Sequence, residues 1–247
     1  IRRPPRSTLD RSSAASDVYK RQLLLFDIDG TLLLSGGAGK RALNRAFREL
    51  FGVNDGFDSI PVAGRTDELI FRDAIKQCGI ATNASSRSAF FSLYYKYLEQ
   101  EIVCPGRNKG LMPGVRLLLD RLAPLSNVVI GLLTGNFARA AKIKLQYFGI
   151  WDYFVFGAYG DDAPVRDDLV PIAVSRARES DVVITSNVEA SGVGDTPLDV
   201  QCAIVGGARS VAVCTGSYGE YELREAGADS VLPDLTDSER FIRLILG

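Results

Sequence analysis

The chain has 247 residues, of which 46% are hydrophobic and 24% are charged, so it can bury the core of one large domain, with or without a smaller insertion. It contains no histidine, which excludes Ser-His-Asp and Cys-His catalysis, phosphohistidine chemistry and His-Glu-x-x-His zinc sites. Its formal net charge is −1, and no apolar run reaches the roughly 18 residues of a membrane span. We therefore expect neither nucleic acid nor a membrane as a partner.

Residues 1–22 differ in composition from the rest of the chain. They carry six of the 29 basic and two of the 30 acidic side chains, show no apolar periodicity and do not begin with Met. A disordered basic tail, such as a nucleic-acid arm or a transit peptide, is one interpretation. The stretch also resembles a translated sequencing adapter, and we prefer this interpretation: a non-native, disordered tail, with the native N-terminus lost. Without it, 23 basic and 28 acidic side chains leave a net charge of −5.

Short apolar runs and helical periodicity alternate along most of the remaining chain. Three runs are typical of buried parallel strands, at 23–26, 128–133 and 210–213. Helical patterns cover 112–122, 137–148, 168–178 and 198–205. This alternation predicts an α/β fold, a doubly wound parallel sheet with both faces covered, in which ligands bind beyond the carboxyl ends of the strands.

Residues 35–111 interrupt the alternation, because they contain no convincing strand. Apolar residues at helical spacing predict three helices there, over 43–51, 70–78 and 90–98. We interpret this block as an all-helical cap domain inserted into a core of residues 23–34 and 112–247, with hinges at 35–37 and 107–110. The aromatic residues of the third helix fit the interior of the cap better than a binding stripe.

The segment Asp27-Ile28-Asp29-Gly30-Thr31 directly follows the first predicted strand. Strand alternation sends both carboxylates to the same side unless the chain turns, and Gly30 permits a turn. Paired negative charge at the end of a buried strand calls for a cation or for a reaction. A turn in which the aspartates cap backbone amides is the alternative interpretation.

Two further polar segments precede predicted helices. Thr134-Gly135-Asn136 closes the second strand with a hydroxyl and backbone N–H groups, which suits an anion, although such turns also serve as ordinary helix caps. Gly194-Asp195-Thr196-Pro197-Leu198-Asp199 places two carboxylates one turn apart at a helix start. Its alternative interpretation is an N-cap by Asp195, with Asp199 favoured by the helix dipole.

In this order, the three motifs resemble those of the haloacid dehalogenase superfamily of phosphatases and phosphomutases. The resemblance covers nearly all of residues 23–247 and looks strongest to the branch of phosphoglycolate phosphatases and β-phosphoglucomutases. It implies a Rossmann-like core with an inserted cap, Asp27 as a nucleophile that forms an aspartyl-phosphate, and Asp29 as the acid and base. Dehalogenases proper lack the second aspartate, so the resemblance implies phosphoryl chemistry.

The same resemblance implies a Mg²⁺ cofactor. Its ligands would be the Asp27 carboxylate, the Asp29 backbone carbonyl and Asp195. Asp199 would orient the water shell of the metal or hold a neighbouring backbone group. Mg²⁺ prefers carboxylate and carbonyl oxygens and needs no histidine, which agrees with the composition.

Phosphate oxygens would be bound, by the same resemblance, by Thr134 and by the neighbouring Gly135 and Asn136. In the predicted cap, Gly64-Arg65-Thr66-Asp67 precedes a helix, and Arg65 is our candidate for reaching the substrate from there. Thr66 or Asp67 as a helix N-cap is the alternative interpretation of this segment.

The cationic motif of the family is altered in this chain. Relatives usually carry a Lys-Pro pair before the helix that precedes the last motif, and Arg166 is its positional counterpart here. Lys144, on the helix after Thr134, is the other candidate, ahead of Lys142. We expect Lys144 and Arg166 to act together, although each also fits a solvated surface cation.

The strand before Asp195 is the second departure from the family pattern. A strand must end at Val193 to bring Asp195 beside Asp27, yet residues 188–193 have poor strand propensity. Residues 182–184 look more like a strand but lie too far upstream. We therefore expect an unusual strand at 188–193.

Together these features predict a Mg²⁺-dependent phosphatase that acts on a small phosphorylated metabolite. Four widely spaced cysteines favour reduced thiols and hence the cytoplasm. A phosphosugar mutase of the same superfamily is one alternative. A phospho-acceptor or binding protein without turnover is another, but receiver-type modules have about 120 residues and no insertion.

Overall fold

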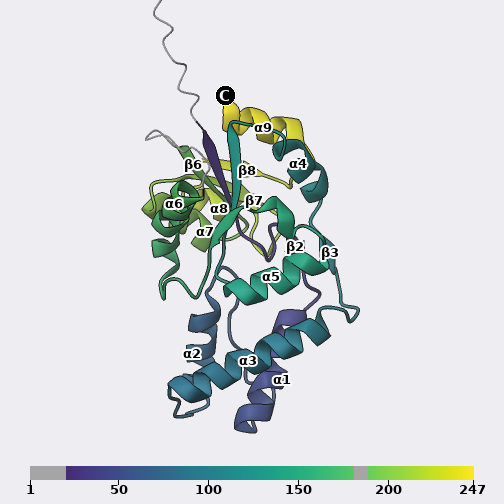
Figure 1. Ribbon diagram of the computed structural model, residues 1–247, viewed down its shortest axis with the longest axis vertical. Helices are drawn as coiled ribbons and strands as arrows, with labels where there is room; N and C mark the ends of the chain where they lie inside the picture. The colour runs from purple at the N-terminus through teal and green to yellow at the C-terminus, as the bar shows by residue number, and fades with distance from the viewer. Residues whose placement is uncertain (1–20, 181–188) are drawn as a thin grey trace, which may run out of the picture.

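The computed structural model describes residues 21–180 and 189–247. In this part of the chain, six parallel strands form one sheet in the order β5-β4-β1-β6-β7-β8 (Figure 1). The strands are β1 (Gln22–Phe26), β4 (Val128–Leu133), β5 (Phe156–Ala158), β6 (Glu189–Gly194), β7 (Arg209–Val213) and β8 (Ser230–Leu232). The predicted doubly wound α/β core is therefore confirmed.

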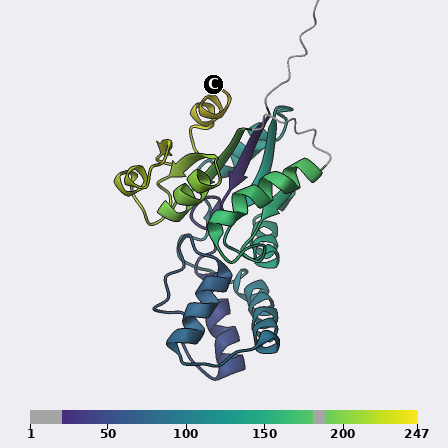
Figure 2. The same cartoon turned by 90° about the vertical axis from the view of Figure 1, so that its left-hand side faces the viewer.

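Strand β1 is buried on both faces of the sheet. Leu24 and Phe26 pack with α4 (Val115–Leu122), α5 (Ala138–Tyr147) and α9 (Ser238–Leu246). Leu23 and Leu25 pack on the other side, with α6 (Leu169–Glu179) and α7 (Pro197–Val205). Because successive strand side chains point to opposite faces, one apolar run supplies both cores. Figure 2 shows the helices on either side of the sheet.

Three shorter helices complete the core: the 3-10 helices η1 (Trp151–Tyr153) and η2 (Arg166–Asp168), and α8 (Glu220–Glu225). Leu223 of α8 packs with Val200, Ala212 and Val231, beside the last two strands of the sheet. Within the described ranges, no helix has both the length and the apolar character that a membrane crossing needs.

Strand β6 forms where the motif requires it, despite its poor propensity. Val193 lies opposite Phe26 in the register, and the strand runs one residue past the expected end, to Gly194. A Cβ atom on Gly194 would collide with the side chain of Asp199, so a small residue is needed for α7 to approach. The alternative strand at 182–184 lies outside the described residues.

The first strand begins at Gln22, which pairs with Val128 and Glu189. It therefore starts one residue inside the segment 1–22 that we assign to the tail. Residues 1–20 lie outside the described range, and the non-native tail stays a prediction.

Between β1 and β4, three helices form a separate group, which we call the helical insertion (lower half of Figure 1). They are α1 (Ala38–Phe51), α2 (Asp67–Gln77) and α3 (Ala84–Glu101). Their buried interior is rich in aromatic side chains: Phe47, Phe57, Phe71, Phe90 and Phe91. The aromatic residues of the third helix thus fill an interior, as predicted. Phe137, just before α5, stacks on Phe91 with ring centroids 4.4 Å apart.

A short antiparallel ribbon joins the helical insertion to the core. It consists of β2 (Leu33–Leu34) and β3 (Gly110–Leu111), with Leu34 opposite Gly110. The sequence predicts no strand within 35–111, and this prediction is wrong at Gly110–Leu111. Two residues are too short a run to produce a periodic signal.

Candidate active site

Three buried carboxylates meet at the carboxyl ends of β1 and β6. Asp27 follows β1, Asp195 follows β6, and Asp199 lies in the first turn of α7. One oxygen from each lies within 4.8 Å of the others. Adjacent parallel strands end at the same edge of a sheet, so the pairing of β1 with β6 produces this cluster.

The turn after β1 allows the close approach of these groups. The backbone N–H of Asp27 donates to Val193 at 2.9 Å, which continues the pairing of β1 with β6. Gly30 has a φ of 90°, and a Cβ atom there would collide with the carboxylate of Asp195. Glycine is therefore required by both conformation and space. The hydroxyl of Thr31 donates to Asp195 at 3.1 Å.

Arg166 lies between two of the three carboxylates. Its Nη2 atom is 2.9 Å from Oδ1 of Asp27 and also contacts Asp199. Its Nη1 atom donates to the carbonyl of Gly64 in the helical insertion at 2.9 Å. Burial alone would lower the pKa of Arg166, but Asp199 and Asp27 outweigh that effect and raise it. One guanidinium thus connects the acidic cluster to the helical insertion.

Burial makes the carboxylates of the cluster hard to ionise together. It raises the pKa of Asp27 to about 7, with repulsion from Asp199 in the same direction and Arg166 opposing it. It also raises the pKa of Asp195 to about 8, again with repulsion from Asp199 and Asp27. One guanidinium does not balance three clustered acids, and buried oxygen donors of this kind fit a divalent cation such as Mg²⁺.

Both carboxylate oxygens of Asp199 have partners within the protein. Its Oδ2 atom accepts bonds from the N–H of Thr196 at 3.0 Å and from the hydroxyl of Thr196 at 2.7 Å, which closes the capping box of α7. Its other oxygen contacts Arg166. Because both oxygens already have partners, the geometry favours the predicted supporting position over direct ligation.

Lys144 and Asp29 form the second ionic contact of the site. The Nζ atom of Lys144 lies 2.5 Å from Oδ2 of Asp29 and 2.6 Å from Oδ1 of Asn136. The amide of Asn136 donates to the same oxygen of Asp29 and to the hydroxyl of Thr134, both at 2.9 Å. The Asp29 side chain is 40% exposed, and within the described residues its Oδ1 atom has no hydrogen-bond partner.

A cavity of about 260 Å³ lies between these core residues and the helical insertion. Most of the predicted site residues line it, namely Asp27, Asp29, Arg65, Gly135, Asn136, Lys144, Arg166 and Asp195. Thr134 and Asp199 lie behind the wall, bonded to Asn136 and Arg166 respectively. The cavity therefore brings together residues from the first strand, from the helical insertion and from the second half of the chain.

Arg65 lies on the cavity wall, but its guanidinium is bound elsewhere. Its Nη2 atom is 2.6 Å from Asp73, and its Nη1 atom donates to the carbonyl of Pro61 at 3.1 Å. These contacts do not favour the predicted contact of Arg65 with the substrate. Thr66 caps α2, accepting the N–H of Leu69 at 3.3 Å, which confirms the alternative interpretation of that residue. 

Lys142 lies against the ring of Trp151 and is absent from the cavity lining. Of the two lysines considered for the cationic motif, only Lys144 therefore reaches the predicted site residues.

Asp67 is a site residue whose position the sequence does not reveal. Its carboxylate accepts the N–H of Phe137, and its own N–H donates to Gly135, both at 2.8 Å. The side chain is 7% exposed and lines the cavity. The contact joins residues 70 positions apart, so no local pattern predicts it. The sequence singles out the segment 64–67 as a helix start that reaches the substrate, but it does not indicate the contact of Asp67 with Phe137.

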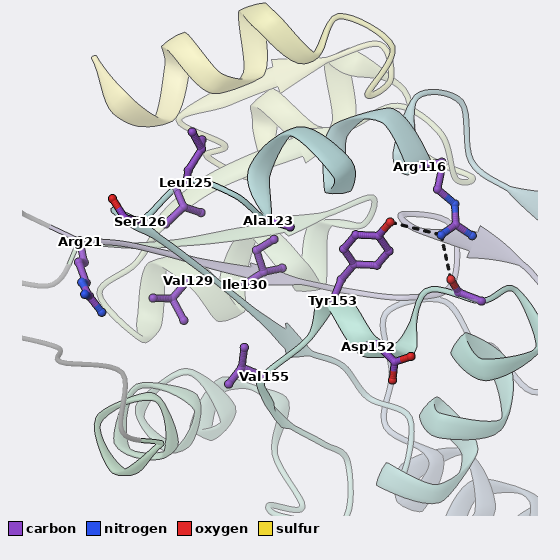
Figure 3. A pocket seen from close by; sticks show the side chains of 12 residues that line it. Arg21, Arg116, Ala123, Leu125, Ser126, Val129, Ile130, Asp152, Tyr153 and Val155 are labelled. Carbon is purple, nitrogen blue, oxygen red and sulfur yellow. Dashed lines mark hydrogen bonds between the residues drawn. The ribbon is translucent and has the colours of Figure 1, made fainter.

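A larger cavity, of about 680 Å³, lies at the opposite end of β4 (Figure 3). Figure 3 shows Arg21 and Arg116 at its two ends with Tyr153 between them. Arg116 already donates to the carbonyl of Gly149 at 2.8 Å. Among the described residues, the only three-acid cluster is that of Asp27, Asp195 and Asp199, so this cavity lacks one. Chemistry, and not volume, therefore identifies the smaller cavity as the candidate active site.

The fold and the acidic cluster agree with one enzyme family. The model of the haloacid dehalogenase-like hydrolase family matches residues 24–203, and a second model, of HAD-hydrolase-like proteins, matches residues 185–238. The chain belongs to the haloacid dehalogenase-like hydrolase family. It is therefore an enzyme of the hydrolase class.

Several known proteins are similar to this chain. A phosphoglycolate phosphatase from Rhodobacter capsulatus is 26% identical over 181 residues, which are 73% of this chain and 78% of that protein. The crystal structure of a predicted phosphoglycolate phosphatase from Haemophilus somnus 129pt has a TM-score of 0.66 and 17% identity, covering 92% of this chain and 99% of that one. A hydrolase from Pseudomonas syringae has a TM-score of 0.65 and 21% identity, with 92% and 100% covered. These structures share the fold predicted from the sequence.

Proposed function

We propose that this hydrolase is a Mg²⁺-dependent phosphatase that hydrolyses a small phosphomonoester through an aspartyl-phosphate. The position of Asp27 carries the proposal. Its carboxylate lines the cavity, contacts Arg166 at 2.9 Å and lies next to Asp195 and Asp199. The relative from Rhodobacter capsulatus, a phosphoglycolate phosphatase, supports the same reaction class.

Asp27 is the nucleophile in this proposal. One of its oxygens attacks phosphorus, the bond from phosphorus to the ester oxygen breaks, and Asp29 gives a proton to the departing alcohol. Water then attacks the aspartyl-phosphate while Asp29 takes its proton, which releases phosphate and restores Asp27. The exposure of Asp29 to the cavity supports this assignment, since a proton donor must reach the substrate.

The two cations have different tasks in the proposed reaction. Arg166 offsets the charge of Asp27 before and after it attacks, because it contacts that carboxylate directly. Lys144 orients Asp29 through their ion pair. Gly135 and Asn136, which line the cavity before α5, bind the phosphate oxygens in this proposal. Thr134 supports Asn136 from behind the wall, because its hydroxyl accepts the amide N–H of that residue.

Mg²⁺ would be held by the Asp27 carboxylate, the Asp29 backbone carbonyl and Asp195, with Asp199 in support. When bound, the ion offsets the repulsion between the nucleophile and the phosphate and polarises the phosphoryl oxygens. The clustered, buried carboxylates support this choice of cofactor. 

The free thiols Cys78, Cys104, Cys202 and Cys214 suit the reducing cytoplasm, where we propose that the enzyme acts.

The helical insertion acts as the cap in this proposal, with residues 35–111 as one domain and 23–34 with 112–247 as the other. Hydrogen bonds hold it against the active site. Arg166 binds the carbonyl of Gly64, and Asp67 binds the N–H of Phe137. Such contacts would exclude water from the cavity while the substrate reacts.

The experiment is incubation with a panel of small phosphomonoesters, with and without Mg²⁺. We expect release of inorganic phosphate only when Mg²⁺ is present. Conversion of a hexose 1-phosphate into its isomer without phosphate release would instead identify a phosphosugar mutase. A phosphorylated enzyme that does not turn over would identify a phospho-acceptor and contradict the proposal.

A further inference from the structure

Asp67 brings an unbalanced negative charge to the cavity wall. Its polar partners are backbone groups of Phe137 and Gly135, and among the described residues no cation lies within 4 Å of its carboxylate. Burial raises the pKa of Asp67 to about 6, with Lys144 and the N–H of Phe137 opposing the rise. Above pH 7 the side chain is therefore mostly ionised.

The basic side chains that line the cavity are already paired with acids. There are four such ion pairs: Lys144 with Asp29, Arg166 with Asp27, Arg65 with Asp73, and Lys40 with Asp58. In the described part of the chain, no basic side chain of the lining is left for a second anion on the substrate. At the catalytic end a phosphate would meet Lys144, Arg166 and the proposed metal ion, whereas a carboxylate beside Asp67 would meet no unpaired cation among the described residues.

Tyr94 of α3 adds an uncharged polar group to the same cavity. Burial, with the charges of Asp67 and Asp29, holds the pKa of Tyr94 well above its ordinary value, so the hydroxyl stays protonated. Within the described ranges this hydroxyl has no hydrogen-bond partner. A Cβ atom on Gly39 would lie 4.0 Å from it and 3.9 Å from Nζ of Lys144, so both groups border the first turn of α1.

We propose that the leaving group of the substrate is an uncharged, hydroxyl-bearing alcohol, and that Asp67 disfavours leaving groups that carry a carboxylate. The inference rests on the proposed phosphatase function. A hydroxyl donates to Asp67 and accepts from Tyr94. A carboxylate there meets a like charge in a confined cavity with no cation to spare, which is a repulsive element that selects against such substrates.

Two phosphomonoesters of nearly equal size test the inference. Ethylene glycol monophosphate ends in a hydroxyl, and 2-phosphoglycolate ends in a carboxylate. With Mg²⁺ at pH 7.5 (about one unit above the range where Asp67 titrates), we expect kcat/KM to favour the hydroxyl compound by about tenfold or more. Equal or greater kcat/KM for 2-phosphoglycolate overturns the inference. Glycerol 3-phosphate and 3-phosphoglycerate provide a second matched pair.

Asp67→Asn removes the charge and keeps an oxygen that can accept the N–H of Phe137. We expect the preference to fall about tenfold, mainly through better use of 2-phosphoglycolate. Asp161→Asn is the matched control, because the exposed Asp161 accepts the next N–H of the same helix, that of Ala138, at 3.0 Å but does not line the cavity. An equal shift in the control overturns the inference, since the effect would then come from the helix start.

Asp73→Asn provides a test that does not depend on the folding of the Asp67 variant. Asp73 is half exposed, and its loss frees the guanidinium of Arg65 at the cavity wall. We expect use of 2-phosphoglycolate to rise severalfold, and an unchanged preference contradicts the proposed role of the ion pair.

p-Nitrophenyl phosphate distinguishes a failure of the phosphatase function from a failure of the inferred leaving-group preference. If no compound, this one included, releases phosphate, the phosphatase function fails and the inference fails with it. If p-nitrophenyl phosphate is hydrolysed and the carboxylated compounds are preferred over the hydroxyl compounds, only the inference is overturned.

Discussion

The Nη2 atom of Arg166 lies 2.9 Å from Oδ1 of Asp27, although 139 residues separate them in the chain. Lys144 makes the corresponding contact with Asp29 at 2.5 Å. The two cations considered for one motif therefore have separate carboxylate partners. This division gives each aspartate of the first motif its own cation and hence its own electrostatic surroundings.

Asp27→Asn should abolish the hydrolysis of p-nitrophenyl phosphate, because an amide cannot attack phosphorus. We expect kcat to fall by about a thousandfold or more, as for other removed nucleophiles. Phosphate release at saturating Mg²⁺ measures this. Asp152→Asn, in the larger cavity, is the control and should leave kcat unchanged. Turnover of Asp27→Asn near the wild-type rate would exclude Asp27 as the nucleophile.

Arg166→Ala should destabilise the protein, because it leaves Asp27 and Asp199 buried without their shared partner. Loss of one member of a buried ionic cluster costs about 3 kcal/mol or more in the free energy of unfolding. Urea denaturation measures the change. Arg224→Ala breaks an exposed pair with Glu220 and should cost no more than about 1 kcal/mol.

Arg166→Lys separates charge from geometry at the same position. A lysine supplies the positive charge but cannot reach Asp27, Asp199 and the carbonyl of Gly64 together. We expect it to recover part of the lost stability while kcat stays at least about tenfold below wild type. A kcat equal to that of wild type would show that charge alone is sufficient.

Mg²⁺ should both activate and stabilise the enzyme. A ligand at a hundred times its dissociation constant adds about 2.7 kcal/mol of stability, so Tm should rise on addition of Mg²⁺ and fall again with a chelator. Asp195→Asn removes one proposed ligand and should reduce the Tm shift and the activity together. Asp152→Asn should keep both. Full activity of the wild type in excess chelator would contradict metal dependence.

Gly135→Ala should disturb the contact between the helical insertion and the core. A Cβ atom there would collide with the carbonyl of Arg65 and lie 3.0 Å from Cα of Thr66. Because the obstacle is backbone, we expect a loss of about 1–3 kcal/mol in stability and a higher KM. Gly110→Ala is the matched control, with no atom within 4 Å of the added carbon. Equal behaviour of the two variants would contradict this view of the interface.

Strands β1, β4 and β7 of the sheet were predictable, because strands buried on both faces leave continuous apolar runs. Strands β5 and β8 were not predicted, because three residues are too short for a clear apolar run. Strand β6 is instructive, since its residues Glu-Ala-Ser-Gly-Val-Gly have little strand propensity. Its position followed from the motif, which requires Asp195 beside Asp27. Its conformation comes from pairing with β1 on one side and β7 on the other, which outweighs local preference.

The acidic cluster was predictable mainly from the resemblance of the three motifs to those of the haloacid dehalogenase superfamily. The apolar strand pattern alone located only Asp27, because the strand before Asp195 has little strand propensity. The contacts that the helical insertion makes with the core were not predictable. Whether Arg65 turns to Asp73 or to the cavity, and whether Asp67 reaches Phe137, depends on how the helical insertion packs on the core. Such packing leaves no periodic pattern in the sequence, because the partners come from separate elements. A small shift of the helical insertion would also exchange one hydrogen-bond partner for another.

The ribbon of Leu33–Leu34 with Gly110–Leu111 has a consequence for how such enzymes diversify. The chain leaves the sheet and returns to it at neighbouring points, so the whole intervening block could be exchanged as a cassette without rerouting any strand. A graft of residues 35–109 onto a related core would transfer Asp67 and Tyr94, which line the cavity, and would keep the host's counterparts of Asp27 and Asp29. Under the proposed function, a gene would acquire a new substrate by replacing one contiguous stretch of its coding sequence.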